Sequence, residues 1–401
     1  MRLINNLNKF SILFLVALTF HISVSKASQN LLQDDHAEQE LIQIIDLIQA
    51  QKTDIALSKS SRLLEKFPNF KLLSAVRADI LYSHHHELNE PLNLIKDQQQ
   101  QQNFISEASA RLDSVSDSVQ LHQQHIPDLL KYIDSSTAYA FIIDFSKSRL
   151  YLFKNTPNNP PELIVDHYLT IGKEGYNKQV VGDKKTPLGI YHITSFLADK
   201  QLPELYGWGA FPINYPNAWD KKMHRTGSGI WLHGVPRDTY SRPPLDSRGC
   251  MVISNNFLIN LAPYLKINTP VILTQSINWV DKSNFIKQSK TYKNAFNTWK
   301  NAWQSKDINK YLNFYSKDFN NNKKDYRAWN KHKRRIFNKT KQIKLKIEQL
   351  TVLTYPGEKD LLSVSFYQHY TGDRYRSKGF KQQYWKLEDD GIWRIIYEFS
   401  A

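Results

Sequence analysis

The sequence is short of cysteine, of long apolar runs and, in one stretch, of acidic residues. Its 401 residues contain a single cysteine, Cys250, which excludes an intramolecular disulfide. After residue 27 no segment is long and apolar enough to span a bilayer, and no cysteine follows at a position for lipid attachment. Cross-links therefore do not stabilise this chain, and the lone thiol needs another explanation.

The N-terminal segment has the pattern of an export signal. Arg2 and Lys9 form a basic start, residues 10–20 are apolar apart from two hydroxyl side chains, and Ala27 is a small residue suited to cleavage. An uncleaved anchor is the alternative, but about eleven apolar residues are too few to span a bilayer. We predict a signal peptide at residues 1–27 and a mature chain that is exported, periplasmic or cell-wall associated, and not an integral membrane protein.

Acidic residues are scarce in residues 282–348, which hold 19 Lys or Arg against 4 Asp or Glu. The formal net charge of the whole chain is +15, so this block accounts for the excess. A basic block suggests nucleic acid in a cytoplasmic protein, but the export signal argues against that partner. Two interpretations remain open: contact with an anionic envelope surface, or a solvated helical face.

Length and periodicity predict a multidomain protein, because 401 minus 27 residues leaves more chain than one hydrophobic core usually organises. Apolar residues recur at helical spacing from Leu41 to Ile48, and residues 28–135 are predicted to be a helical accessory region. The glutamine run 98–102 is placed between helices. Residues 136–276 are predicted to be mostly β, and residues 283–401 an α+β cone-like domain.

Alternation of apolar and polar residues places the strands. In the central region we predict a hairpin over 140–153, a short helix over 255–265, and further strands at 163–171, 189–194, 229–233 and 271–274. Beyond Asp281 we predict a linker, one helix over 285–314, and strands at 343–353, 361–369, 382–387 and 393–399.

Cys250 has the surroundings of a nucleophile. A thiol attacks a carbonyl as thiolate, and an imidazole can take its proton; His233, at the end of a predicted strand, is the candidate base. Gly234 lets the chain turn sharply after it, and a backbone carbonyl can orient the imidazole. Gly249 lets backbone N–H groups approach a reacting carbonyl, so the amides of Gly249 and Cys250 are candidates for an oxyanion hole. No metal or cofactor is needed for this chemistry.

Residues 231–234 (Trp-Leu-His-Gly) and 247–250 (Ser-Arg-Gly-Cys) resemble the active-site signature of the YkuD-type L,D-transpeptidases, which rework peptidoglycan stem peptides. The resemblance extends through residues 144–153 and 182–191 and covers about 140 residues. It implies that Cys250 is the nucleophile, His233 the base and Gly234 the source of the orienting carbonyl. Ser247 and Gly249 would then shape the cysteine loop.

The chain departs from the family pattern at two positions. Arg248 stands where the family commonly has His, and Val252 stands where many members have Arg. A guanidinium can bind a stem-peptide carboxylate bidentately, or Arg248 is simply exposed. Aromatic residues flank the loop and either line a substrate groove or pack in the core. They are Tyr206, Trp208, Trp219 and Trp231.

The C-terminal region resembles the nuclear transport factor 2-like or SnoaL-like cone domains, through residues 299–303, 306–307, 311 and 314–315 and the later Trp385 and Trp393. Together with the basic block it suggests a targeting module for wall or membrane. An exported chain with this domain order also resembles the L,D-carboxypeptidases of cell-shape pathways.

The resemblance predicts acyl transfer on peptidoglycan stem peptides. Cys250 would cleave the bond before the terminal D-Ala of a tetrapeptide and pass the acyl group to an amine, as an L,D-transpeptidase does. The alternative is an L,D-carboxypeptidase, in which water takes the acyl group and a tripeptide remains. A sortase-like enzyme is disfavoured because its sequence pattern around the nucleophile is missing. The non-enzyme alternative is a wall-binding protein with a degenerate site.

Overall fold

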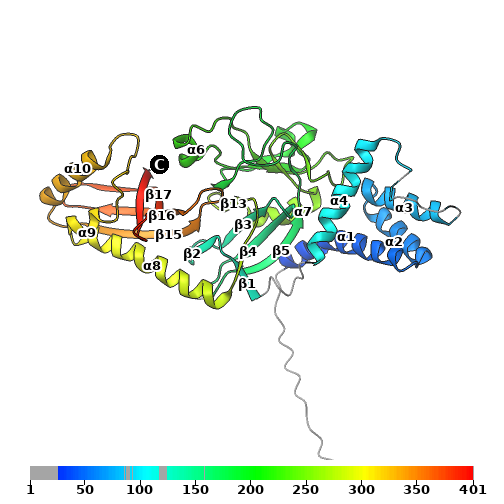
Figure 1. Ribbon diagram of the computed structural model, residues 1–401, viewed down its shortest axis with the longest axis horizontal. Coiled ribbons are helices and arrows are strands. Elements are labelled where there is room, and N and C mark those ends of the chain that lie inside the picture. The colour runs from blue at the N-terminus through cyan, green and yellow to red at the C-terminus, as the bar shows by residue number, and fades with distance from the viewer. Residues whose placement is uncertain are drawn as a thin grey trace, which may run out of the picture.

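The computed structural model describes residues 26–84, 86, 91–92, 94–116, 124–157 and 159–400. Most of the predicted signal peptide, residues 1–25, lies outside the described residues. Three parts follow one another along the long axis of the molecule, with the helical region at one end, the central β region in the middle and the C-terminal region at the other end (Figure 1). Within the described ranges no helix has the length and apolar character needed to cross a bilayer.

The N-terminal part is built from four helices: α1 (Lys26–Gln49), α2 (Thr53–Lys66), α3 (Lys71–Ser83) and α4 (Gln98–Ser116). Their apolar faces, spaced as predicted, pack into one core that includes Leu41, Leu63 and Leu73. The glutamine run predicted between helices is instead the first turn of α4. Asp97 explains the start of this helix, because its carboxylate accepts hydrogen bonds from the amides of Gln99 and Gln100.

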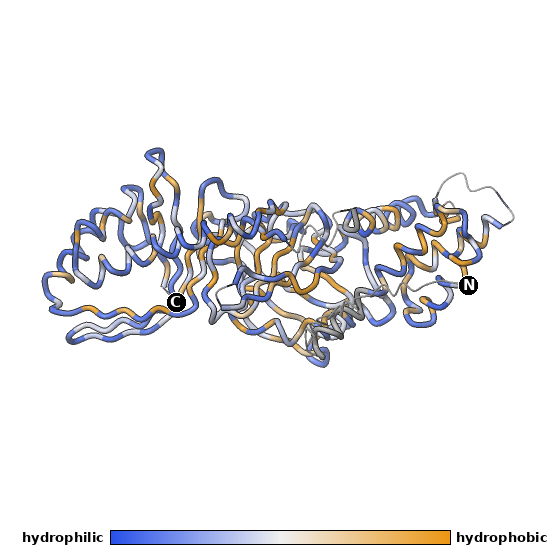
Figure 2. Tube along the Cα trace, turned by 90° about the horizontal axis from the view of Figure 1, so that it is seen from below, coloured by the Kyte–Doolittle hydropathy of each residue, from blue (hydrophilic) through white to orange (hydrophobic). Residues whose placement is uncertain are grey.

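The central part contains a five-stranded sheet in the order β5-β4-β3-β13-β7. The predicted hairpin is confirmed: β3 (Tyr139–Asp144) and β4 (Arg149–Lys154) pair antiparallel. One face of the sheet packs on a core that includes Leu152, Leu258 and Leu273, and Figure 2 shows the apolar stretches gathered in the interior of this part. The remaining strands are β5 (Glu162–Tyr168), β7 (Gly189–His192) and β13 (Pro270–Thr274).

A second, four-stranded sheet in the order β12-β10-β9-β8 contains His233 and is adjacent to Cys250. Its central strand β10 (Trp231–His233) pairs antiparallel with β9 (Gly209–Pro212) and parallel with β12 (Met251–Val252). Helix α7 (Asn255–Leu261) follows β12, as predicted, and is capped by Ser254, whose hydroxyl accepts from the Phe257 amide. The other short elements are β6 (Ile171–Gly172), β8 (Leu197–Ala198), α6 (Ala218–Lys222) and β11 (Leu245–Ser247).

The C-terminal part is a helix-covered antiparallel sheet, as the α+β cone pattern predicts. The single helix predicted over 285–314 is wrong: Lys306 has a positive φ of 59°, and Asp307 caps a new helix by accepting from the Lys310 amide. The elements are α8 (Lys282–Gln304), α9 (Ile308–Leu312), α10 (Tyr326–Lys339), β15 (Lys344–Thr354), β16 (Leu361–Thr371), β17 (Arg376–Leu387) and β18 (Trp393–Ser400).

The segment before residue 136 also contributes strands, although its pattern predicts only helix. Strand β2 (Leu130–Ile133) adds to the edge of the C-terminal sheet beside β15, and β1 (His125–Pro127) pairs with β14 (Trp279–Asp281). Helix α8 begins directly after β14, so the linker predicted beyond Asp281 is not found. Such short strands carry little periodicity of their own, and pairing across domains stabilises them.

The central and C-terminal parts meet through aromatic and charged side chains. Trp219 stacks on Tyr384 with a ring-centroid distance of 4.9 Å, and its indole N–H donates to Glu358 at 3.0 Å. Arg225 bridges Asp220 of α6 and Glu358 of the C-terminal part. Trp219, predicted to flank the cysteine loop, is therefore part of this interdomain contact.

Candidate active site

The cysteine lies in a tight loop between β11 and β12. Gly249 has φ +116°, and a Cβ at this position would lie 2.8 Å from the carbonyl oxygen of Lys185. Only glycine adopts this conformation without strain, so the residue before the thiol is dictated by backbone geometry. Cys250 itself is partly exposed, while Arg248 is exposed to solvent.

Ser247 closes the loop from inside. Its hydroxyl donates to the Cys250 carbonyl at 2.6 Å and accepts from the Gly249 amide at 3.0 Å. The Gly249 N–H is thus already paired, which leaves the Cys250 amide as the candidate oxyanion donor. Ser247 is buried, and its two bonds hold both ends of the turn that presents the thiol.

Thr186 supports the same loop from the outside and was not singled out as a site residue from the sequence. Its hydroxyl donates to the Gly249 carbonyl at 3.0 Å and accepts from the Gly172 amide at 2.9 Å. The side chain is fully buried. The sequence did hold a signal for this role, because Thr186 and the proline after it lie within residues 182–191, which are part of the family resemblance.

His233 and Cys250 are brought to one face of the second sheet. The parallel pairing of β10 and β12 sets Leu232 opposite Met251 and His233 opposite Val252. Cys250 therefore lies beside Trp231, two residues before His233. Since alternate residues of a strand point to the same face, the side chains of Trp231, His233 and Cys250 share one face.

The His233 ring is held in a defined orientation. Its Nδ1 lies 2.6 Å from the carbonyl oxygen of Gly234, which requires that Nδ1 carries the proton and donates it. Nε2 is then the free basic nitrogen. The ring of Tyr206 packs edge-on against the imidazole at a centroid distance of 4.9 Å.

Burial makes the resting pair neutral. It lowers the pKa of His233 to about 4, although the hydrogen bond to the Gly234 carbonyl acts in the opposite direction. It also raises the pKa of the Cys250 thiol, against the lowering effect of the Trp231 amide and of the charges on Arg242 and Lys178. At neutral pH the site therefore holds a protonated thiol and a neutral imidazole.

Asn255 fixes the chain around Gly234 and is a second residue that sequence reasoning missed. Its side chain accepts from the Trp208 amide at 2.9 Å and donates to the Val235 carbonyl at 2.7 Å. A Cβ at Gly234 would lie 2.0 Å from Asn255 Oδ1, so no other residue fits there without displacement. Its position at the start of a predicted helix gave no indication of this role.

The aromatic residues proposed to line a groove divide into two groups. The ring of Tyr206 contacts both Trp231 and His233, each at 4.9 Å between centroids. The Trp208 ring instead packs on the exposed Phe196 at 5.2 Å and against the core of the central part. Tyr206 and Trp231 thus border the thiol, and Trp208 supports the fold beneath them.

Comparisons with known proteins agree with this geometry. The family model of the L,D-transpeptidase catalytic domain (YkuD) matches residues 138–273, and that of the Cds6 C-terminal NTF2-like domain matches residues 291–399. No match was found among curated proteins.

Two solved structures are similar over most of their own lengths. Bd1075 from Bdellovibrio bacteriovorus is 32% identical with a TM-score of 0.59, and the match covers 69% of this chain and 98% of that one. The helical cell shape determining protein Pgp2 from Campylobacter jejuni is 24% identical with a TM-score of 0.55, covering 69% of this chain and 94% of that one. At that identity the second likeness shows a shared fold.

Proposed function

This chain belongs to the YkuD family of L,D-transpeptidase catalytic domains, extended by a C-terminal NTF2-like domain, and we propose that it transfers acyl groups of peptidoglycan stem peptides through Cys250. The substrate is a tetrapeptide stem, and the bond cleaved lies between its third residue and the terminal D-Ala. The third residue is a diamino acid that is joined to D-Ala through its L-configured centre. The bond cleaved therefore links an L-centre to a D-centre, as the name L,D-transpeptidase states.

In the first half-reaction the thiol becomes an acyl carrier. His233 Nε2 takes the proton from Cys250 as sulfur attacks the scissile carbonyl, and the Cys250 amide stabilises the oxyanion. The tetrahedral intermediate then breaks its C–N bond. The imidazolium returns the proton to the departing amine, so free D-alanine leaves and a thioester remains on Cys250.

In the second half-reaction an acceptor takes the acyl group from the thioester. The amine of another stem attacks the carbonyl, His233 takes its proton, and the returning proton restores the thiol as the C–S bond breaks. The product is a crosslink between two third residues. Cys250 and His233 serve each half-reaction in turn, and Gly234 holds the imidazole in place throughout.

One observation carries this proposal: the Gly234 carbonyl orients the His233 ring at 2.6 Å, and the strand that ends in His233 pairs in parallel with the strand that directly follows Cys250. A structural histidine has no need of a neighbouring thiol on a glycine-bounded loop. Ser247 and Thr186 stiffen this loop, which is what a reacting atom requires.

The test is incubation of the purified mature protein with disaccharide tetrapeptide, followed by mass spectrometry of the products. Crosslinked dimers with release of D-alanine support transpeptidation. The Cys250→Ala variant should lose turnover by at least a thousandfold while keeping its unfolding transition. Absence of any product from the wild type, with a free thiol demonstrated, would refute acyl transfer and favour the wall-binding alternative.

A second candidate function is L,D-carboxypeptidation, in which water replaces the amine and tripeptide is the product. The observation that favours it is the fold shared with a helical cell shape determining protein, over 69% of this chain and 94% of that one. The same incubation separates the two reactions, because tripeptide without dimer indicates that water reaches the thioester. Muropeptides of cells with and without the enzyme would show the same difference.

We also propose that the chain works outside the cytoplasmic membrane, at an anionic envelope surface. Helices α8 and α10 expose many of the cations of residues 282–348, including Lys287, Lys290, Arg334 and Arg335. Exposed like charges favour a polyanionic partner. Co-sedimentation with purified sacculi should weaken as salt rises, and salt-independent binding would contradict a charge-based contact.

A further inference from the structure

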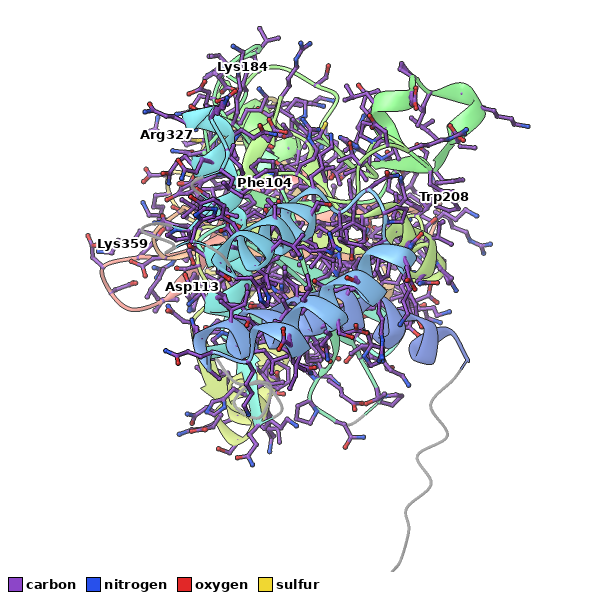
Figure 3. All side chains as sticks on the ribbon, turned by 90° about the vertical axis from the view of Figure 1, so that its right-hand side faces the viewer. Phe104, Asp113, Lys184, Trp208, Arg327 and Lys359 are labelled. Carbon is purple, nitrogen blue, oxygen red and sulfur yellow. The ribbon has the colours of Figure 1, made fainter. Side chains whose placement is uncertain are left out.

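The segment between His233 and Ser247, residues 234–246, is mostly irregular, and the helical region holds it in place. Tyr240 is buried in the core of the helices, with its ring 4.4 Å from that of Phe70 and 5.1 Å from that of Phe67. Its amide donates to the carbonyl of Asn69. Viewed from the helical end, the helices lie directly in front of the catalytic part, with Phe104 of α4 among them (Figure 3).

Two polar contacts continue this attachment beyond Tyr240. The Ser241 hydroxyl donates to Glu107 of α4 at 2.6 Å. The next carbonyl, that of Arg242, accepts from the Tyr168 hydroxyl at 2.9 Å and from the Thr170 hydroxyl at 3.0 Å. Residues 240–242 are therefore fixed one after another, and the backbone of Arg242 has little freedom.

The anchored backbone directs the Arg242 side chain toward the cysteine loop. Its Nε donates to the Asp246 carboxylate at 2.7 Å, and its Nη2 donates to the Asp246 carbonyl, also at 2.7 Å. Asp246 is the residue before Ser247. The guanidinium thus lies along the strand that leads into the loop, and its side chain is 19% exposed.

Arg242 also stands close to the position that lacks the family's arginine. Thr170, which binds the Arg242 carbonyl, pairs with Val252 through two backbone hydrogen bonds of 2.9 Å. The positive charge of Arg242 lowers the pKa of His233 and of the Cys250 thiol. Arg248, by contrast, is exposed.

Lys178 is the other cation that acts on the thiol, but its ammonium is already engaged. It donates to the Asp183 carboxylate at 2.6 Å and to the Val180 carbonyl at 3.0 Å, and its side chain is buried. Arg242 uses Nε and Nη2 for Asp246, and among the described residues no hydrogen bond is recorded for its Nη1. A guanidinium has five N–H donors, so it keeps capacity for an anion.

We propose that Arg242 binds the C-terminal carboxylate of the donor stem peptide and thereby selects stems that end in a free acid. This inference rests on the proposed function, because it concerns the substrate of the same reaction. The carboxylate carbon of the terminal residue is three bonds from the scissile carbonyl, or about 4 Å. The Arg242 guanidinium bonds to Asp246, the residue before Ser247, so it lies beside the loop that carries the nucleophile, and the contacts of Tyr240 and Ser241 with the helical region set its position.

The experiment compares two donors, the disaccharide tetrapeptide and the same compound with its C-terminal carboxylate amidated. With the full-length mature wild type, release of D-alanine or D-alaninamide should be about tenfold to a hundredfold more efficient in kcat/KM for the acid, the range of a charge-assisted hydrogen bond. Arg242→Gln should lose that preference mainly through the acid, and its kcat/KM on the amide should fall by a smaller factor, because the charge of Arg242 also acts on His233 and Cys250. Arg242→Lys should recover part of it.

Arg248→Gln is the matched control, since it removes an arginine six residues away and should keep the full acid preference. Equal efficiency of the wild type on acid and amide overturns the proposal without any variant. So does an acid preference that survives in Arg242→Gln or disappears in Arg248→Gln. No turnover of either donor by the wild type refutes the proposed function itself, and this inference with it.

Discussion

Glu38→Gln should undock the helical region from the catalytic part. Glu38 of α1 is buried and accepts from Arg111 of α4 at 3.0 Å and from Arg149 of β4 at 2.7 Å. It is thus the one carboxylate in this cluster that joins a cation of the helical region to a cation of the catalytic sheet. Glutamine keeps the shape of the side chain and removes its charge, so the change tests the electrostatic link between the two parts.

The magnitude follows from the pKa of Glu38. Burial alone would raise this pKa, but the charges of Arg149 and Arg111 lower it from 4.5 to about 2. At about 1.4 kcal/mol for each pKa unit, the charged form stabilises the folded state by about 3–4 kcal/mol. This agrees with the cost of about 3–5 kcal/mol for removing one partner from a buried ion pair. The lower end applies, because Arg111 keeps Glu107 and Arg149 keeps Asp166.

The sign of the pH dependence follows as well. Since the folded-state pKa lies below the unfolded one, the stabilisation is complete above about pH 4.5 and is lost as pH falls toward 2. The difference between wild type and Glu38→Gln should therefore be constant near neutrality and shrink across this window.

Urea unfolding followed by circular dichroism measures the effect. A loss of about 3 kcal/mol should lower the midpoint of the transition that includes the helices by about 1 M. Glu40→Gln, two residues along the same helix, is the control, because Glu40 is partly exposed and lies 3.8 Å from an exposed lysine. That change should cost at most about 1 kcal/mol. Equal midpoints for Glu38→Gln and Glu40→Gln would refute the reasoning.

Three further predictions concern the catalytic loop. Because the pKa of His233 is about 4, kcat/KM should fall by half near pH 4 and stay level from pH 5.5 to 7; a midpoint near 6.5 in the rate profile would contradict the burial of the imidazole. Gly234→Ala should lower kcat at least tenfold and stability by about 1–3 kcal/mol, since its Cβ collides with Asn255; wild-type kinetics and melting would exclude this clash. Ser247→Ala should cost about 1–3 kcal/mol in thermal unfolding, because it leaves two backbone groups of the loop unpaired, and an unchanged melting temperature would argue against this role.

Much of the architecture could be predicted because its elements have strong local patterns. The hairpin of β3 and β4 and the four long strands of the C-terminal sheet have alternating apolar residues, and the structure contains them, although β17 begins at Arg376 and not at the predicted residue 382. The errors fall where a neighbouring side chain or another domain decides. Asp97 starts a helix through the glutamine run, and β2 exists because it pairs with β15.

The sequence by itself determined the candidate reacting groups and the residue types beside them. Cys250 is the only thiol, and the glycine before it is required by a backbone conformation that other residues rarely adopt. Constraints on backbone conformation act within a few residues, so they can be recognised from the residue types alone. The glycine after His233 has a different cause, since the side chain it would collide with comes from α7.

Only the tertiary structure decided what surrounds those groups. Thr186 reaches the cysteine loop from a segment distant in the chain, Asn255 of α7 packs against Gly234 after the other strand, and Arg242 follows residues that contact the helical region. Spacing along the chain does not encode which loops converge, because convergence depends on how sheets and helices pack. The acid selectivity proposed for Arg242 therefore depends on how the domains pack together, whereas the proposed thiol chemistry can be predicted from the local sequence motif.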